Sequence, residues 1–290
     1  MIRRVTSTDN RIYKLCASLA MKKYRDKEGK YLIEGENLLD EAIKNKADIV
    51  AIILREDIAM LLEKPQAGDG PECKPLPCGM QGISSLITQG ETRRGGMPEV
   101  YAMPSKLFDK LAQAVTSQGI LAVVSKPGNA KETLINANTP RSNLLILDRL
   151  QDLGNIGTVI RTADAAGYLG IIAMKGTGDI YAPKVIRAAA GSVFRIPIIY
   201  VENNRELQQF ARDLDKRLVA TAFDTKHFYY EEDLTAGIGL IIGNEGNGIS
   251  DELMELADVK VKIPMKGNIE SLNAAVAAGI IMYEAMRKEN

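Results

Sequence analysis

The chain has 290 residues, of which 46% are hydrophobic and 26% charged, a balance typical of globular proteins and not of disordered or fibrous ones. Lys and Arg together number 37, as do Asp and Glu, so the formal net charge is zero and a uniformly basic nucleic-acid coat protein is excluded. The length exceeds that of an average domain, and we expect two domains.

The cysteines and the N-terminus point to a reduced cytoplasmic protein. Cys16, Cys73 and Cys78 are too few and too scattered for a disulfide scaffold. Cys73 and Cys78 have no second Cys/His pair to complete a zinc site, and the only histidine is the distant His227, so we expect no metal. The segment MIRRVTSTDNRIYKL lacks the apolar core of a signal peptide, and no apolar run approaches the roughly 18 residues of a membrane helix.

Positive charge gathers at the start of the chain. Residues 1–31 contain nine basic and three acidic side chains, a net charge of +6, so the rest of the chain carries −6. A basic segment ahead of a mildly acidic chain indicates contact with phosphate groups. A solvated helix face is the alternative that charge alone leaves open.

In the first half of the chain, apolar runs alternate with amphipathic stretches. In chain order, the pattern predicts a strand, turn and helix over 31–43, a buried strand over 49–54, a helix over 55–64, a strand over 100–102, a helix over 104–115 and a strand over 120–125. Residues 65–98 carry many glycines and little periodicity, and they predict an irregular, partly disordered surface excursion.

The second half of the chain has a different pattern. A polar segment with two prolines and a glycine predicts a linker over 127–142. Beyond it, continuous apolar runs alternate with amphipathic helices, which indicates a parallel sheet covered on both faces. The expected organisation is therefore a smaller α/β domain over 1–126, the linker, and an α/β domain over 143–290.

The first candidate motif is LDRLQDLGNIGTVIRTADAAG, at the end of the first strand of the second domain. Apolar residues at helical spacing predict the buried side of a helix: Ile156, Val159, Ile160 and Ala163. Arg161 then points away from this side, and Asn155 stands at the helix opening. The glycine-rich turn presents backbone N–H groups that suit an anion, although an ordinary turn with an asparagine cap is the alternative.

The second motif is GLIIGNEGNGIS. Its glycines have the wrong spacing for a dinucleotide fingerprint, and no acidic residue follows about 20 positions on, so a nicotinamide cofactor is not expected. The motif offers exposed backbone at the carboxyl end of a strand, where open α/β sheets bind ligands. Glu245 lies inside it, and a solvated loop carboxylate is the alternative for this residue.

The third motif is KIPMKGNIESLNAAVAAGIIMYEAM, in which Ser271 can cap a long final helix. The expected buried face of this helix consists of Leu272, Ala275, Val276, Gly279, Ile280 and Tyr283. Small residues (Ala274, Ala275, Ala277, Ala278 and Gly279) allow another backbone to approach closely. Internal packing and a subunit interface both remain open.

The three motifs, in this order, resemble the SpoU (TrmH-like) family of RNA 2′-O-ribose methyltransferases. The resemblance rests on N-x-G-x-x-x-R-T-A-D-A-A-G, on G-N-E-G-x-G-I and on I-P-M-x-G-x-x-x-S-L-N-x-A-x-A. The segment APKVIRAAAGSVFRIPI is a further match, with Ala190 where members often have Ser. YLIEGENLLDEA and TSQGILAVV are similar to the substrate-binding domain that precedes the catalytic domain in many members.

This resemblance implies a SPOUT-type α/β domain tied in a trefoil knot, which periodicity alone does not suggest. It also implies S-adenosyl-L-methionine as the cofactor, held by the knotted loops. The cofactor-binding residues that it implies are Thr221, Ile242, Gly243, Asn244, Ile263, Met265, Ser271 and Leu272.

The resemblance further places four polar residues at the reaction centre: Asn155, Arg161, Glu245 and Asn273. A ribose 2′-hydroxyl must lose its proton as the methyl arrives, and His227, the usual candidate base, lies outside all three motifs. A guanidinium stays protonated in proteins, so we expect Arg161 to grip the phosphate beside the target ribose. The phosphate or a transiently neutral arginine would take the proton. Glu245 and Asn155 would orient Arg161 and the ribose, and Asn273 would hold the hydroxyl.

The expected substrate is structured RNA, with ribosomal RNA favoured, and a homodimer is implied by the resemblance. RNA phosphates would dock on the basic N-terminal segment, through Arg3, Arg4, Arg11, Lys14, Lys22, Lys23 and Arg25. A transfer-RNA 2′-O-ribose methyltransferase of the same fold is one alternative. A non-catalytic RNA-binding or ribosome-assembly factor is the other. The nucleotide that is methylated cannot be read from the sequence.

Overall fold

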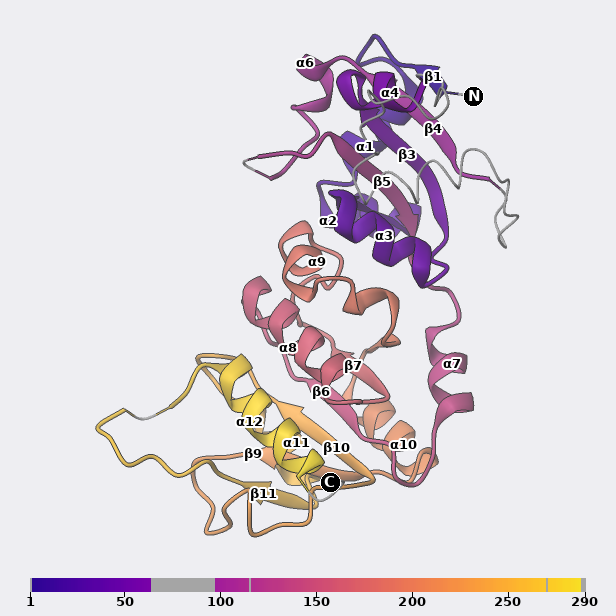
Figure 1. The fold of residues 1–290 in the computed structure, drawn as a ribbon. Coiled ribbons are helices and arrows are strands. Elements are labelled where there is room, and N and C mark those ends of the chain that lie inside the picture. The colour runs from indigo at the N-terminus through magenta and orange to yellow at the C-terminus, as the bar shows by residue number, and fades with distance from the viewer. Residues whose placement is uncertain (1, 64–96, 115, 270, 288–290) are drawn as a thin grey trace, which may run out of the picture. The chain divides into compact units, whose positions relative to one another are not determined.

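The computed structural model describes residues 2–63, 97–114, 116–269 and 271–287, and the chain forms two compact units (Figure 1). Unit 1 contains the chain up to Pro127 together with Tyr181–Pro183, and unit 2 contains the remainder. The irregular excursion expected over 65–98, with Cys73 and Cys78, lies outside the described residues except for its last two positions.

Unit 1 is built on a mixed five-stranded sheet with the strand order β1-β4-β3-β5-β2. Its strands are β1 (Ile2–Arg4), β2 (Lys30–Glu34), β3 (Ile49–Arg55), β4 (Glu99–Met103) and β5 (Ile120–Ser125). The pairs β1–β4 and β4–β3 are parallel, whereas β5 runs antiparallel to β3 and to β2. The strands predicted at 49–54, 100–102 and 120–125 are confirmed.

Among the described residues of unit 1, five short helices pack on this sheet: α1 (Arg11–Ser18), α2 (Lys22–Glu28), α3 (Glu36–Lys44), α4 (Glu56–Glu63) and α6 (Ser105–Phe108). α1 packs through Ile12 and Cys16 against β3 residue Ile53. Cys16 is a free thiol, and burial raises its pKa to about 12, so it is unreactive in the folded state. The helix predicted over 104–115 is shorter than expected, because α6 ends at Phe108.

The segment 127–142 differs from the expected linker, because it contains a helix that packs on unit 2. This helix, α7 (Ala130–Ala137), buries Leu134 completely in the core of that unit. Beyond the helix, Nζ of Lys216 donates to the carbonyl of Thr139 at 2.7 Å. The segment is therefore part of the second unit's packing, although its composition is polar.

Unit 2 is built on a six-stranded sheet with the strand order β11-β9-β10-β6-β7-β8. All five neighbouring pairs are parallel, as the apolar runs predicted. The strands are β6 (Leu144–Leu147), β7 (Gly170–Met174), β8 (Ile198–Val201), β9 (Arg217–Thr221), β10 (Ile238–Ile242) and β11 (Val259–Val261). Every residue of β6, β7 and β10 is buried, which requires helices on both faces.

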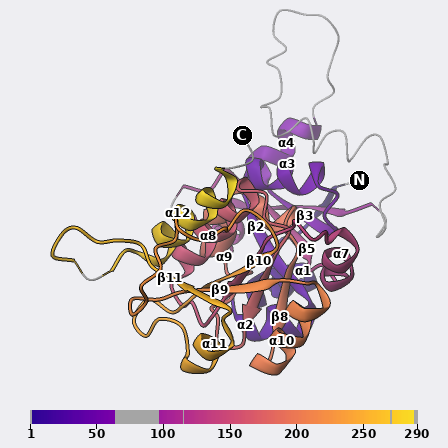
Figure 2. The ribbon, with the colours of Figure 1, turned by 90° about the horizontal axis from the view of Figure 1, so that it is seen from below.

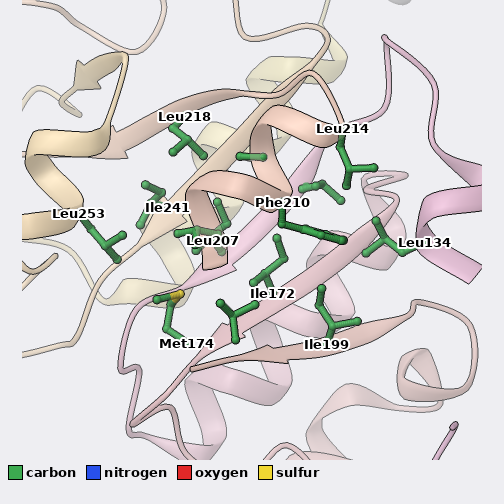
Figure 3. Packing of buried hydrophobic residues seen from close by; sticks show 14 of the residues in the cluster. Leu134, Ile172, Met174, Ile199, Leu207, Phe210, Leu214, Leu218, Ile241 and Leu253 are labelled. Atoms are coloured by element: carbon green, nitrogen blue, oxygen red, sulfur yellow. The ribbon is translucent and has the colours of Figure 1, made fainter. Parts of the chain in front are cut away.

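Helices cover both faces of this sheet (Figure 2). α8 (Leu153–Ala165) and α12 (Ala274–Met286) pack on each other on one face. α10 (Asn204–Asp213) and α11 (Asp251–Leu256) lie on the other face. Figure 3 shows Leu207 and Phe210 of α10 and Leu253 of α11 packed against the strand residues Ile172 and Ile241. The predicted doubly covered sheet is confirmed.

α9 (Pro183–Ala189) follows β7 and leads to the 3₁₀ turn Ser192–Phe194. Within the described parts of the chain, no helix is both long and apolar enough to cross a membrane. In the same parts, no group of His, Cys, Asp or Glu side chains is arranged to hold a metal ion.

Candidate active site

The three sequence motifs meet at one edge of the parallel sheet of unit 2. Because all six strands run in the same direction, their carboxyl ends lie at the same edge, where open α/β sheets bind ligands. The loop after β6 leads into α8, the loop after β10 carries Glu245, and the segment after β11 leads to Asn273 and α12. Side chains that are distant in the sequence therefore come within hydrogen-bonding distance.

Glu245 connects the first two motifs. Its carboxylate accepts hydrogen bonds from the backbone N–H groups of Gln151 (3.2 Å) and Asp152 (3.0 Å). It also accepts one from Nδ2 of Asn155 at 3.1 Å. Three donors at the entry to α8 thus hold the carboxylate, although Glu245 itself is an exposed loop residue.

Asn155 connects this pair to the third motif. Its Oδ1 accepts a hydrogen bond from Nδ2 of Asn273 at 2.9 Å. Oδ1 of Asn273 in turn accepts from the backbone N–H groups of Ala275 (2.9 Å) and Val276 (3.3 Å), which makes Asn273 the N-cap of α12. The chain of hydrogen bonds Glu245–Asn155–Asn273 joins all three motifs.

Both helix caps differ from the sequence prediction. α12 begins at Ala274 with Asn273 as its cap, so the expectation that Ser271 caps this helix is wrong. α8 is capped by Asp152, whose Oδ1 accepts from the backbone N–H of Asn155 at 2.8 Å. The spacing of Asp152, three positions before that N–H, is a capping signal that the sequence contained and that we missed.

The pKa of Glu245 bears on whether its carboxylate could act as a base. Partial burial raises the pKa of its carboxyl, but the hydrogen bonds from Asn155 and from backbone N–H groups outweigh burial and lower the pKa below its ordinary value. The pKa of Asp152 is also lowered, chiefly by the backbone hydrogen bond from Asn155. A carboxylate with a lowered pKa is a weak base. Glu245 is therefore suited to orienting its neighbours and not to taking a proton from an alcohol.

Arg161 lies on α8, two turns beyond the helix start, and is exposed. Six residues of α-helix place it about 9 Å along the axis from Asn155. Among the described residues, its guanidinium has no hydrogen-bond or ion-pair partner, whereas Arg149 binds Asp148 through two nitrogens, at 3.0 and 3.1 Å. The structure does not join Arg161 to Glu245 or Asn155, so its donors remain available to a ligand.

The loop after β10 is held by a close backbone approach. A Cβ on Gly243 would lie 2.3 Å from the carbonyl carbon of Gly248, so only glycine fits there. The N–H and C=O groups of Asn244 and Gly248 exchange two hydrogen bonds of 2.9 Å. The Asn244 side chain accepts from the N–H of Gly246 at 3.0 Å and donates to the carbonyl of Arg149 at 2.9 Å. Both the backbone and the side chain of Asn244 are therefore engaged in holding this loop together.

The other predicted cofactor-binding residues lie at the ends of the neighbouring strands. Ile242 is 2% exposed at the end of β10, and its carbonyl accepts a hydrogen bond from the N–H of Asp148 at 2.8 Å. Thr221 ends β9, and its hydroxyl is 3.4 Å from the carbonyl of Ile241. Ile263 and Leu272 are half-buried apolar side chains, and Met265 is also half-buried. Backbone polar groups beside apolar side chains suit an adenine ring and a methionine-derived sulfonium chain, so these residues fit S-adenosylmethionine.

The basic residues of unit 1 divide into two groups. Arg25 is 4% exposed, and its Nη1 donates to the carbonyls of Leu19 (2.7 Å) and Ala20 (2.8 Å) at the end of α1. The expectation that Arg25 contacts RNA is therefore corrected, because its guanidinium stabilises the α1–α2 turn.

The remaining six basic residues lie at the surface. Arg3 pairs with Glu99, Arg4 with Glu56 at 3.0 Å, and Lys14 with Asp9 at 3.0 Å. Surface ion pairs of this kind are weak, so they leave these side chains able to bind phosphate instead. Arg11, Lys22 and Lys23 are exposed.

Fold and site together define an α/β enzyme that binds its ligand at the carboxyl edge of a parallel sheet. Residues 142–283 match the SpoU rRNA Methylase family, and residues 10–122 match the MRM3-like substrate binding domain. The chain belongs to the SpoU rRNA methylase family.

Relatives and a solved structure are similar to this chain over two thirds or more of its length. RlmP from Bacillus subtilis (strain 168), a 23S rRNA (guanosine(2553)-2'-O)-methyltransferase, is 31% identical over 97% of this chain and 98% of its own. RlmB from Xanthomonas campestris pv. campestris, a 23S rRNA (guanosine-2'-O-)-methyltransferase, is 35% identical over 68% of this chain and 81% of its own. The crystal structure of an AdoMet-bound rRNA methyltransferase from Sinorhizobium meliloti has a TM-score of 0.80 at 28% identity, covering 99% of this chain and 98% of that one. The predicted fold class and the prediction of an S-adenosylmethionine-dependent RNA methyltransferase are confirmed at the level of the family.

Proposed function

We propose that this protein transfers a methyl group from S-adenosylmethionine to a ribose 2′-hydroxyl of ribosomal RNA, as a homodimer in the cytoplasm. The observation that carries the proposal is the chain of hydrogen bonds Glu245–Asn155–Asn273, which fixes polar groups from three separate loops at one sheet edge. The substrate follows from the likeness to RlmP and RlmB. Residues 1–126 would dock the RNA and residues 143–290 would carry the reaction.

The cofactor would be held by the loops that follow β9, β10 and β11. These loops supply Thr221, Ile242, Gly243, Asn244, Ile263, Met265, Ser271 and Leu272, and they are also the loops that the implied trefoil knot would tie together. S-adenosylmethionine, when bound, supplies an electrophilic methyl group on sulfur. The close approach of Gly243 to Gly248 would fix the shape of the loop after β10 that takes part in this site.

Arg161 would bind the RNA phosphate beside the target ribose. Its guanidinium can donate two parallel hydrogen bonds to a phosphate, and this bidentate geometry orients the nucleotide as well as attracting it. The hydroxyl proton would pass to that phosphate or to a transiently neutral Arg161. Glu245 and Asn155 keep the start of α8 in place, and Asn273 would hold the hydroxyl through the network that it shares with Asn155.

α12 offers the surface for the proposed homodimer. Val276 and Tyr283, two turns apart, are each 51% exposed, although the sequence pattern placed both on the buried face. Gly279 lies between them, and a Cβ added there would be 3.8 Å from Cγ2 of Thr162 on α8. A second copy could cover these exposed apolar side chains and the adjoining part of α8.

The basic surface of unit 1 supports docking of RNA. Reversing the charge of Arg11, Lys22 and Lys23 should weaken RNA binding and reduce the slope of log Kd against log salt by about 0.7 to 0.9 for each phosphate that the protein no longer neutralises. The affinity for S-adenosylmethionine should stay the same. An unchanged salt slope would contradict docking through this segment.

The function is tested by mapping 2′-O-methylation across ribosomal RNA from cells with and without this protein. Loss of one modification from 23S rRNA, restored by purified protein and S-adenosylmethionine, is the expected result. Loss of a transfer-RNA modification instead would favour a transfer-RNA methyltransferase. A silent calorimetric titration with S-adenosylmethionine would favour a non-catalytic RNA-binding factor.

A further inference from the structure

The loop between β9 and β10 concentrates aromatic side chains. The chain has ten Tyr, five Phe and no Trp, and four of these fifteen rings lie within residues 223–230. We name this segment the aromatic strap, and its rings are Phe223, Phe228, Tyr229 and Tyr230. The catalytic residues proposed above do not include any of them.

The aromatic strap is fixed alongside the end of β11. The backbone N–H of Lys262 donates to the carbonyl of His227 at 3.0 Å, and the N–H of Tyr229 donates to the carbonyl of Lys262 at 3.1 Å. The hydroxyl of Thr225 donates to the carbonyl of Lys260 at 3.1 Å. Phe228 and Lys262 form an isolated parallel bridge, so backbone hydrogen bonds hold residues 227–229 beside the end of β11.

Two of the four rings, Phe223 and Tyr230, are exposed, whereas Phe228 and Tyr229 are half-buried. Phe223 is 71% exposed and Tyr230 is 45% exposed, whereas Phe108 in unit 1 is fully buried. The rings of Phe228 and Tyr230 are stacked with centroids 5.4 Å apart and planes 12° apart, and Tyr229 meets Tyr230 edge-on at 5.2 Å. An ordered, exposed set of rings leaves apolar area in water, which a flat aromatic ligand would cover.

Positive charge accompanies the rings. Nζ of Lys262 lies 5.3 Å from the centroid of Phe228, and Lys260 is two positions earlier on the same strand and exposed. The loop also carries four acidic residues. Glu231 accepts from the N–H of Phe228 at 2.9 Å, Glu232 lies 3.3 Å from Nδ1 of His227, and Asp233 accepts from the hydroxyl of Thr235, whereas Asp224 is exposed beside Phe223. Rings with lysines beside them match the combination of bases and phosphates in single-stranded nucleic acid.

The aromatic strap also adjoins the proposed reaction site. Phe223 follows Thr221 by two residues, and Lys262 directly precedes Ile263. Thr221 and Ile263 both belong to the proposed cofactor site at the carboxyl edge of the sheet. A nucleotide bound on the strap would therefore be close to the nucleotide that receives the methyl group.

We propose that the aromatic strap binds unpaired RNA bases next to the target nucleotide, by stacking on Tyr230 and Phe223, while Lys260 and Lys262 contact the adjoining phosphates. Proteins recognise unpaired RNA bases through such stacking, which tolerates different base sequences. This inference rests on the proposed function, and it makes single-stranded character beside the target a requirement for the substrate.

The first test uses Phe223→Ala and Tyr230→Ala, which change exposed side chains. The dissociation constant for substrate rRNA should rise about 5- to 100-fold for each variant, the range found when the stacking of one base is removed. Tyr230→Phe keeps a ring and should bind RNA like the wild type. Tyr200→Ala is the matched control, since Tyr200 is a 47% exposed tyrosine on β8, at the opposite edge of the sheet. Equal RNA affinity of Tyr230→Ala and Tyr200→Ala would overturn the proposal.

The second test exploits the absence of Trp from the sequence. Tyr230→Trp introduces a single tryptophan, whose fluorescence a single-stranded oligoadenylate of about ten nucleotides should quench and an RNA duplex of equal length should not. Tyr200→Trp should be quenched by neither. Quenching of Tyr230→Trp by S-adenosylmethionine and not by the oligonucleotide would overturn the proposal, because the strap would then belong to the cofactor site. This readout needs no methyl transfer, so a wild-type protein without methyltransferase activity would contradict the proposed function and leave the stacking test intact.

Discussion

The side-chain amide of Asn273 donates a hydrogen bond to Oδ1 of Asn155 at 2.9 Å, although the two residues are 118 positions apart. The nitrogen and the oxygen of each side-chain amide are both hydrogen-bonded. Nδ2 of Asn155 donates to Glu245, and Oδ1 of Asn273 accepts from the backbone N–H of Ala275 at the start of α12. An amide bound at both ends has one orientation. The packed pair of helices α8 and α12 thus carries a polar network whose geometry is set before a substrate arrives, as catalysis by positioning requires.

Asn155→Asp should lower kcat/KM for methyl transfer by about 100-fold, the scale expected when a reacting group is misplaced by roughly 1 Å. The new carboxylate has no N–H group to donate to Glu245, and it adds a like charge beside that residue. Kinetics with rRNA, and calorimetry with S-adenosylmethionine, would measure the change. Asn203→Asp is the matched control, because Asn203 caps α10 at 3.0 Å and aspartate caps equally well. Equal loss in both variants would show a general effect of the substitution.

Arg161→Lys should lower kcat/KM by about 100-fold or more, because lysine is a point charge and cannot replace two parallel hydrogen bonds to a phosphate. Arg205→Lys, on an exposed position of α10, should leave the rate unchanged. Single-turnover assays with saturating rRNA would separate loss of positioning from loss of affinity. Near-normal transfer by Arg161→Lys would contradict the bidentate role.

Gly243→Ala should abolish binding of S-adenosylmethionine, since its Cβ would lie 2.3 Å from backbone atoms of Gly248 and Ile249 and the loop would have to move. Gly246→Ala is the matched control from the same loop, and it should keep its affinity for S-adenosylmethionine. Its Cβ would lie 3.7 Å from Oδ1 of Asn244, which is an ordinary van der Waals contact. Isothermal titration of both variants with S-adenosylmethionine would compare them. Retained affinity in Gly243→Ala would place the cofactor elsewhere.

The sequence predicted the second sheet well, because its strands are buried on both faces and so appear as uninterrupted apolar runs. The motifs also predicted which polar residues meet, in the case of Asn155, Glu245 and Asn273. Their partners could not be predicted, since the backbone N–H groups of Gln151 and Asp152 are available only once β10 lies beside β6. The packing of the predicted linker could not be predicted from its polar composition, because only two buried residues, Ala130 and Leu134, attach its helix to the core of unit 2.

The buried face of α12 shows a further limit. The sequence AAVAAGIIMYEAM is apolar on almost every side, so periodicity cannot select the face that packs. Packing against α8 determines which face of α12 is buried. Ala278, Ile281 and Met282 are buried, whereas Val276 and Tyr283 are exposed. Of the expected buried face, Ala275 is confirmed, and Val276 and Tyr283 are wrong.

Arg25→Met should lower the free energy of unfolding by about 2 to 3 kcal/mol, because two carbonyls at the end of α1 lose a charged donor in a buried place. Lys23→Met, two residues earlier and exposed, should change stability by less than about 0.5 kcal/mol. Urea unfolding followed by circular dichroism would measure both. If Arg25→Met unfolded like the wild type but bound RNA more weakly, Arg25 would contact RNA and would not serve mainly to stabilise the fold.

Glu245 makes the stability of the site depend on pH in acid. Partial burial raises the pKa of the Glu245 carboxyl, but its hydrogen bonds favour the ionised form and lower the pKa overall. The ionised carboxylate therefore stabilises the folded state at pH values above the ordinary glutamate pKa. This stabilisation is lost as the pH falls through the lower pKa of the folded state. Glu245→Gln cannot ionise. Its amide nitrogen replaces one of the two carboxylate oxygens that accept hydrogen bonds from Gln151, Asp152 and Asn155, so at least one of these donors loses its acceptor. The difference in Tm between the wild type and Glu245→Gln should therefore be constant from pH 8 to about 5 and should shrink below about 4.5.

The measurement is thermal unfolding of both proteins at half-unit steps of pH. Glu202→Gln is the control, because Glu202 forms an exposed ion pair with Lys175 at 3.0 Å, and such pairs contribute little to Tm at any pH. A Tm difference for Glu245→Gln that is as large at pH 3.5 as at pH 7 would mean that the carboxylate charge does not hold the loop. A difference that shrinks in acid ties the start of α8 to the ionised Glu245, and with it the position of Asn155.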